Sequence, residues 1–228
     1  MNSINPLGDA AALVCLVDEQ AAFAFAEAVR AQPQPWLIDV VQAYMSVAVY
    51  FDLGRIDYRR VSWYLSELDT SSTATVAGRS HIIPCCYEFA LDLDHVAART
   101  GLSSDEAINL HLAKEYRVYA IGFCPGFPYL GYLPAALCGV PRLSSPRYEV
   151  AAGSVGLTGK QTGIYTEVRP GGWNIIGRTP LELVNVADGY FPLRTGDRVQ
   201  FRRIDSAEFQ RLTGERLPLE DQRVCASS

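Results

Sequence analysis

The sequence has no apolar run near its N-terminus that is long enough to cross a bilayer. The longest such run there covers residues 10–17, far below the ~20 residues that a membrane helix needs. No basic segment precedes it, so we expect neither a secretory signal nor a membrane anchor. These absences predict a cytoplasmic protein with no membrane partner.

Histidine is scarce, and cysteine lacks a useful spacing. The chain has three histidines and six cysteines, none of them at Cys-x-x-Cys spacing. In a long chain without an export signal, such cysteines indicate reduced thiols rather than a disulfide framework. The histidines and cysteines also lack the spacing of metal ligands, so no metal site is predicted.

The composition is that of an ordinary globular protein, with 49% hydrophobic and 20% charged residues. Its 228 residues suit one large domain or two modest ones. Charge is uneven: residues 1–114 hold 14 acids and 7 bases (−7), whereas residues 115–228 hold 11 acids and 13 bases (+2). Nearly all bases of the second half are arginine, which suits a small carboxylate or phosphate.

Residues 122–178 concentrate the glycine and proline of the chain. This stretch holds 11 of the 18 glycines and 6 of the 13 prolines, interleaved with Phe, Tyr and Trp. Glycine permits positive φ and close approach, while proline fixes φ, so the mixture predicts turns, bulges and short strands. Two interpretations stay open: the corners of a small β-barrel, or loops shaped around a ligand.

The first 70 or so residues alternate strand and helix patterns. We predict a strand at 12–17, a helix from Asp18 or Glu19 to about Arg30, two strands within 38–51, and a second helix capped by Asp57. This order predicts a small α+β domain. Residues 69–79, rich in Ser, Thr and Gly, are the best linker candidate.

The remainder is predicted to form short strands with a helical pair. Strands are expected at 81–87 and 116–123, separated by helices at 92–100 and 104–113, the second with a capping box between Ser103 and Glu106. Further short strands are expected at 147–150, 154–157, 163–168, 173–177, 181–186 and 197–204.

The helical pair also has the outline of a helix-turn-helix. Its second helix, however, begins with Asp105 and Glu106, and this charge is wrong in sign for phosphates. We therefore predict no nucleic-acid partner. Residues 153–160 resemble a phosphate-binding loop, but the glycine spacing is one residue too long and Gln161 stands where Ser or Thr should follow. The chain thus has no complete nucleotide motif.

Three lone side chains are candidates for chemistry of their own. Ser154 has a partial nucleophile-elbow context, but the glycines after it argue against the required helix. Cys124 would need an adjacent base to become a nucleophile. His111, beside Glu115 and just before a strand, is the one histidine that we select as a site candidate; the alternative is a helix-terminal imidazole.

Five blocks follow one another in a fixed order: residues 122–131 (GFCPGFPYLG), 141–147 (PRLSSPR), 152–156 (AGSVG), 161–165 (QTGIY) and 170–179 (PGGWNIIGRT). Together they resemble the KipI family, whose members are also named allophanate hydrolase subunit 1 or the B-type subunit of 5-oxoprolinase. Weaker blocks extend the resemblance over nearly the whole chain. The sequence departs from the family at Ala151 and Thr166, where the family often has proline.

The resemblance implies an α+β protein of two domains. Residues 1–80 would form a small N-terminal α+β domain of ferredoxin-like type, and residues 81–228 a cyclophilin-like β-barrel of the carboxyltransferase-domain subunit 1 type. It also implies an ATP-dependent 5-oxoprolinase that opens 5-oxo-L-proline to L-glutamate. The partners would be a KipA protein, which is the C-type subunit of 5-oxoprolinase, and a large A-type subunit. The complex would use ATP, and the chain would be active only within it.

Three other functions stay open. The resemblance also implies a non-catalytic inhibitor of a sensor histidine kinase, or a carboxyltransferase-type component of an allophanate hydrolase or urea carboxylase system. A prolyl isomerase follows from the barrel type alone, which is an argument from fold and not from a site.

Candidate site residues come from residue type and position in the matching blocks. Backbone amides of residues 126–131 are expected to form an anion-binding nest. The catalytic candidates are His111, Gln161, Tyr165 and Arg178. The substrate-binding candidates are Pro125, Gly126, Phe127, Tyr129, Arg142, Arg147, Gly171, Gly172 and Trp173.

Overall fold

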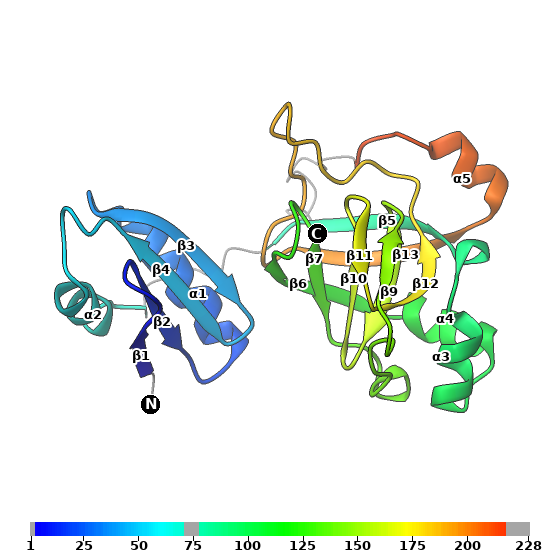
Figure 1. The fold of residues 1–228 in the computed structure, drawn as a ribbon, viewed down its shortest axis with the longest axis horizontal. Helices are drawn as coiled ribbons and strands as arrows, with labels where there is room; N and C mark the ends of the chain where they lie inside the picture. Colours follow the sequence, from blue (N-terminus) through cyan, green and yellow to red (C-terminus); the bar gives the residue numbers. More distant parts are fainter. Residues whose placement is uncertain (1–2, 71–77, 218–228) are drawn as a thin grey trace, which may run out of the picture. The chain divides into compact units, whose positions relative to one another are not determined.

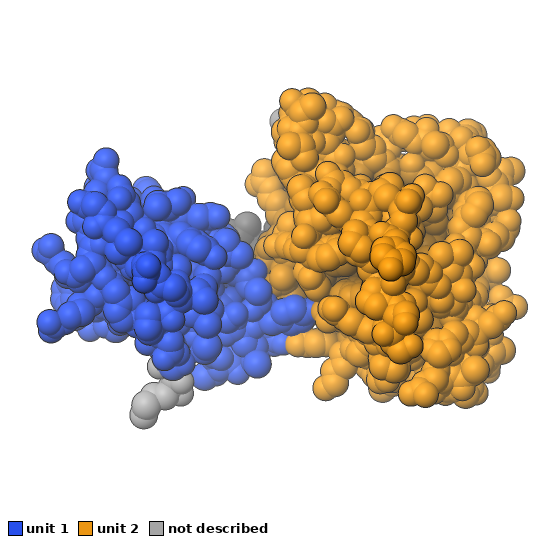
Figure 2. All heavy atoms as spheres, viewed as in Figure 1, with its two compact units in different colours: residues 1–77 blue, residues 78–228 orange. Residues whose placement is uncertain are grey.

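The chain divides into two compact units, Met1–Ala77 and Gly78–Ser228 (Figure 2). The computed structural model describes residues 3–70 and 78–217. The predicted domain boundary at 80/81 falls inside the first strand of the second unit, and most of the predicted linker lies outside the described residues. Within those residues, no helix is long and apolar enough to cross a membrane.

The first unit is a four-stranded antiparallel sheet with two helices (Figure 1). Its strands are β1 (Ser3–Pro6), β2 (Ala11–Cys15), β3 (Leu37–Ala43) and β4 (Ser46–Phe51), in the order β1-β2-β4-β3. Because β4 pairs antiparallel with both β2 and β3, these two strands run parallel with β4 between them. The sequence patterns did not predict β1.

The helices of this unit begin where the sequence predicts. In α1 (Glu19–Ala31), the Asp18 side chain accepts a hydrogen bond from the Ala21 amide at 2.7 Å, and in α2 (Tyr58–Ser66) Asp57 caps in the same way. The α+β prediction is confirmed. A ferredoxin-like arrangement is not confirmed, because the unit opens with the β1–β2 pair and ends on a helix within the described residues.

The second unit is built on a closed barrel of seven strands in the order β10-β7-β6-β13-β5-β12-β9 (Figure 1). The two strands β5 and β13 are parallel, and the other neighbours are antiparallel. The barrel strands are β5 (Ser80–Cys86), β6 (Glu115–Ile121), β7 (Pro128–Gly131), β9 (Ser154–Thr158), β10 (Gln161–Ile164), β12 (Asn174–Arg178) and β13 (Arg198–Ile204).

Other elements cover the barrel. A separate ribbon pairs β8 (Arg147–Val150) with β11 (Arg169–Gly171). Helices α3 (Leu93–Thr100) and α4 (Ser104–Leu112) pack against each other, with the predicted capping box at Ser103, and α5 (Ser206–Leu212) contacts β5. Two short 3-10 turns, Tyr87–Phe89 and Ala135–Leu137, complete the described elements.

Two predicted strands differ from the structure. No strand forms over 181–186, where the described chain makes only isolated bridges at Glu182 and Asn185. The expected strand at 163–168 is replaced by β10 and β11, with a non-strand segment between them that includes Tyr165 and Thr166. Both segments are held instead by individual backbone hydrogen bonds. The Tyr165 amide donates to the Ser154 carbonyl at 2.9 Å, and the Glu182 amide donates to the Glu215 carbonyl at 2.8 Å.

Candidate functional site

The loop between β6 and β7 has a tight backbone fold. The Gly122 amide donates to the Phe127 carbonyl at 3.1 Å, and the Phe127 amide donates to the Cys124 carbonyl at 3.1 Å. Phe123 and Gly126 both have positive φ, 68° and 71°, which is uncommon for a bulky residue such as phenylalanine. The fold turns Phe127 inward and leaves Phe123 58% exposed.

An aromatic cluster forms directly behind this loop. The Phe127 ring, 1% exposed, packs edge-on against Tyr129, Tyr165 and Trp173 at centroid distances of 5.0, 5.3 and 5.5 Å. Such edge-to-face pairs add about 0.5–1.5 kcal/mol each beyond the burial of area. The cluster is separate from the barrel core. Four of the predicted site residues therefore meet in one place.

The rings of this cluster pack directly against Gly163, at a position where a side chain would not fit. A Cβ atom at this position would lie 2.9 Å from Trp173 Cζ3 and 3.0 Å from Phe127 Cζ. We expect Gly163→Ala to lower the unfolding free energy by about 1–3 kcal/mol, because overpacking forces rings off their rotamers. Gly122→Ala is the matched control, since nothing lies within 4 Å of its Cβ position. Equal urea midpoints for the two variants would contradict the packing assigned to Gly163.

The two tyrosines of the cluster stay neutral near pH 7. Burial raises the pKa of Tyr129 and of Tyr165, while the positive charge of Arg142 opposes this shift in both. The phenols are therefore hydrogen-bonding groups and not bases. Gly171 packs against the Tyr165 hydroxyl so closely that a Cβ atom there would lie 2.2 Å from it.

Arg147 is occupied by an ion pair. Its Nη1 and Nη2 donate to the two carboxylate oxygens of Asp92 at 2.9 and 2.7 Å, and the Ile175 amide donates to the same carboxylate at 2.7 Å. This pair fastens β8 to the segment before α3 and to β12. The Arg147 guanidinium, which we predicted to bind substrate, thus binds Asp92 within the chain. This contact favours a structural role for Arg147.

Thr166 joins the aromatic cluster to a neighbouring pocket. Its hydroxyl donates to the Pro125 carbonyl at 2.6 Å and lies 3.5 Å from Cys124 Sγ. Tyr165 and Thr166 also line the pocket, where their segment runs between the cluster and the cavity. The hydroxyl thus supplies a link between two loops at a position where a proline would have none.

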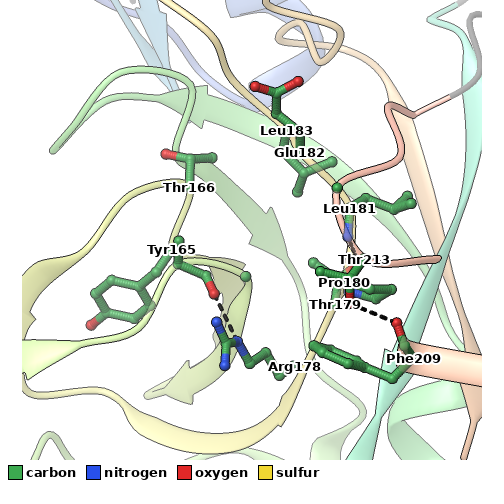
Figure 3. A pocket seen from close by; sticks show the side chains of 13 residues that line it. Tyr165, Thr166, Arg178, Thr179, Pro180, Leu181, Glu182, Leu183, Phe209 and Thr213 are labelled. Atoms are coloured by element: carbon green, nitrogen blue, oxygen red, sulfur yellow. Dashed lines mark hydrogen bonds between the residues drawn. The ribbon is translucent and has the colours of Figure 1, made fainter. Parts of the chain in front are cut away.

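The pocket has a volume of about 390 Å³ and contains Arg178 (Figure 3). Arg178 Nε donates to the Ala152 carbonyl at 2.9 Å, and its guanidinium lies 5.8 Å from the Phe209 ring centre. No described residue accepts a hydrogen bond from its two terminal nitrogens. In Figure 3 the Tyr165 ring points away from Arg178, so this tyrosine lines the pocket with its backbone side.

The other polar groups of the pocket are mostly engaged. Glu182 accepts from Arg216 at 2.7 Å and from Asn185 at 2.8 Å, and these hydrogen bonds lower the pKa of its carboxyl. The Thr213 hydroxyl donates to the Phe209 carbonyl at 2.8 Å. Arg178 is therefore the described cation that offers open donors to a ligand here.

Gln161 is placed away from Arg178. In the β9–β10 and β9–β12 ladders, Gln161 lies opposite Thr158, whereas Arg178 lies opposite Ser154. Four residues of strand separate these positions by roughly 13 Å at ~3.3 Å per residue. The structure does not bring these two catalytic candidates together. The predicted amide nest is not formed over Pro128–Gly131, because β7 pairs there with β6 on one side and β10 on the other.

His111 is fully buried in the described chain and belongs to the barrel interior. Its Nδ1 lies 2.8 Å from the Tyr87 hydroxyl and its Nε2 3.2 Å from the Thr162 hydroxyl, which itself donates to the Gly156 carbonyl. Thr162 must then accept from Nε2–H, and Tyr87 donates to Nδ1. This arrangement favours packing over catalysis for His111.

The buried imidazole predicts an acid-sensitive fold. Burial lowers the pKa of His111 to about 3, against ~6.5 in an unfolded chain. The unfolded state therefore binds a proton there below pH 6.5 that the folded state does not. We expect wild type to lose about 2 kcal/mol more unfolding free energy between pH 7 and pH 5 than His111→Gln. Urea titrations at both pH values measure this; identical losses would contradict it.

Most of the pocket walls were not predicted from the sequence. Thr179, Phe209 and Thr213 line it, and Phe209 and Thr213 come from α5 and its end, which carry no motif. Asp92, the partner of Arg147, is also not among the predicted site residues. The described residues hold no cluster of His, Cys, Asp and Glu suited to a metal ion, and the five described cysteines are free.

Comparison with known sequences gives a consistent set of relatives. A family model described as carboxyltransferase domain, subdomain C and D, matches residues 2–190. The B-type subunit of 5-oxoprolinase from Bacillus subtilis (strain 168) is 36% identical over 228 residues, covering 90% of this chain and 94% of the relative. That of Escherichia coli O157:H7 is 51% identical over 111 residues, 48% of this chain and 50% of the relative.

Solved structures show the same fold. TTHA0988 in space group P212121 matches with a TM-score of 0.73 and 38% identity over 82% of this chain, which spans only 37% of that protein. The Kluyveromyces lactis urea amidolyase matches with a TM-score of 0.73 over 95% of this chain and 16% of its own, at 18% identity. The closed barrel is thus the cyclophilin-like barrel of carboxyltransferase domains.

Proposed function

Because the chain belongs to the carboxyltransferase-domain family that includes the B-type subunits of 5-oxoprolinase, we propose that it is such a subunit of an ATP-dependent 5-oxoprolinase. The complex would open 5-oxo-L-proline to L-glutamate by adding water across the lactam C–N bond. This chain would act with a KipA protein as C-type subunit and with an A-type subunit, and the complex as a whole would use ATP.

The Arg178 pocket is the observation that carries this proposal. 5-Oxoproline is a small ring with one carboxylate, and a pocket of about 390 Å³ lies in the size range of small-ligand sites. The open terminal nitrogens of Arg178 offer the fork geometry that a carboxylate accepts. The neighbouring Phe209 ring and the Pro180 and Leu181 side chains supply apolar walls.

The described pocket residues bind and orient but do not complete the chemistry. Glu182 is held by Arg216, and the histidine candidate, His111, is buried in the barrel. No lining residue pairs a nucleophile with a base. We therefore infer that the partner proteins supply the groups that activate the lactam and water, with this chain as the wall that fixes the substrate carboxylate.

Reconstitution tests the proposal. We expect the complex of this chain with its A-type and C-type partners to hydrolyse ATP only when 5-oxoproline is present, with glutamate formed alongside. Leaving out this chain should abolish both ATP hydrolysis and glutamate formation. Full turnover without this chain, or no 5-oxoproline-dependent turnover with all three proteins, would contradict the proposed function.

A carboxyltransferase role has less support. The putative urea carboxylase of Emericella nidulans is 23% identical over 73% of this chain, which spans 16% of that relative. That likeness is weaker in identity and in shared length than the likeness to the Bacillus subtilis 5-oxoprolinase protein. Inhibition of a sensor kinase stays a prediction.

A further inference from the structure

A second groove lies entirely within the first unit, between the start of β3 and α2. It has a volume of about 670 Å³ and is lined by three arginines and three aromatic residues: Arg55, Arg59, Arg60, Trp36, Trp63 and Tyr64. None of these residues takes part in the Arg178 pocket, which belongs to the second unit. The proposed function therefore leaves this groove without a role.

The groove concentrates positive charge on an acidic unit. Residues 1–77 contain nine Asp and Glu against four arginines, a net charge of −5, and three of the four arginines line the groove. Arg55 is paired with Asp52 at 3.1 Å. Arg59 and Arg60 are exposed, and neither side chain forms an ion pair with any described residue. Their charges are available to an acidic ligand.

The aromatic side chains add an apolar anchor point. Helix α2 buries Val61 and Leu65 in its own unit, which turns Trp63 outward with 68% of its surface exposed. Trp63 follows Arg59 by four residues and Arg60 by three, so the three side chains share one face of the helix. Behind them, Trp36 and Tyr64 form an edge-on pair with centroids 5.4 Å apart. Tryptophan, tyrosine and arginine are the residues enriched at the energetic centres of protein interfaces.

We propose that this groove docks an extended acidic segment of another protein, with carboxylates on Arg59 and Arg60 and an apolar side chain against Trp63. Charge complementarity favours this occupant. A compact polyphosphate fits less well, because Asp57 also lines the groove and its carboxylate already caps the N-terminus of α2 at 2.9 Å. Carboxylates spaced along an extended segment place less negative charge at any one point beside Asp57 than a polyphosphate does.

Fluorescence anisotropy on the full chain tests the docking. The probe is a short fluorescein-labelled peptide of alternating glutamate and leucine, with a lysine–leucine peptide of equal length for comparison. We expect the glutamate–leucine peptide to bind and the lysine–leucine peptide not to bind. Arg59→Glu/Arg60→Glu and Trp63→Ala should each raise the Kd of the acidic peptide about tenfold or more. The charge reversal should not unfold α2, because glutamate in the first turn favours the helix dipole.

The matched control is Arg99→Glu/Arg194→Glu, which changes the same charge at exposed sites of the second unit and should leave Kd unchanged. Equal binding by wild type and Arg59→Glu/Arg60→Glu, or no binding by wild type, would overturn the proposal. So would displacement of the peptide by inorganic triphosphate at equimolar concentration, which indicates a small-anion site. A wild-type dimer that Trp63→Ala dissociates would overturn it in favour of a second copy of the chain.

Discussion

Arg178→Met is expected to lower kcat/KM for 5-oxoproline by about 100-fold in the reconstituted complex. Arg178 offers two open donors in the pocket, and charge-assisted hydrogen bonds are worth about 1.5–3 kcal/mol each. A loss of about 100-fold corresponds to about 2.7 kcal/mol. Steady-state kinetics of glutamate formation measure this effect.

Arg178→Lys separates charge from geometry. Lysine keeps the positive charge but loses the fork, so we expect kcat/KM to fall between the values for wild type and Arg178→Met. Arg202→Met, at an exposed ion pair with Glu208, is the matched control and should keep wild-type kinetics. Size-exclusion chromatography checks that each variant still assembles. If the assembled Arg178→Met complex keeps the wild-type kcat/KM, the pocket does not bind the substrate carboxylate.

Arg147→Met is expected to lower the unfolding free energy by about 2–3 kcal/mol. Removing Arg147 leaves the Asp92 carboxylate, only 8% exposed, with the Ile175 amide as its remaining partner. Breaking a buried pair typically costs about 3–5 kcal/mol, and the 29% exposure of the arginine side chain reduces this through solvent screening. Urea unfolding at pH 7 measures the change.

Two further variants isolate the cause. Arg147→Met/Asp92→Asn should recover part of the loss, because it also removes the stranded charge. Arg169 lies on the paired strand β11 and forms an exposed pair with Glu167. Arg169→Met breaks that pair, and its unfolding free energy should stay within about 0.5 kcal/mol of wild type. If Arg147→Met and Arg169→Met have the same unfolding free energy, the ion pair between Arg147 and Asp92 does not stabilise the β8–β11 ribbon.

Local signals in the sequence predict the regular elements well. Asp18, Asp57 and the Ser103–Glu106 box mark helix starts that depend on neighbouring residues alone, and all three caps form. Strand β1 is not predicted because its four residues are mostly exposed and carry no alternation. The predicted strand at 181–186 does not form, although four of its six residues are apolar, because Leu181 and Leu183 pack on the barrel core and the described chain makes only isolated bridges there.

The candidate site is predicted in part. The aromatic and glycine residues of the matching blocks indicate the cluster of Phe127, Tyr165 and Trp173. Large aromatic side chains are buried by packing against one another, and these three do so in the structure. The roles of Arg147 and His111 could not be predicted from the sequence. Their partners, Asp92 and Tyr87, lie 55 and 24 residues away along the chain.

Protection of Arg178 tests most directly the claim that this chain holds the substrate carboxylate. The assembled complex would be treated with phenylglyoxal, which modifies accessible arginines, and the modification of Arg178 and Arg202 would be followed by mass spectrometry. We predict that 5-oxoproline slows modification of Arg178 at concentrations near its KM and leaves Arg202 unchanged. Equal modification of Arg178 with and without 5-oxoproline would contradict the account.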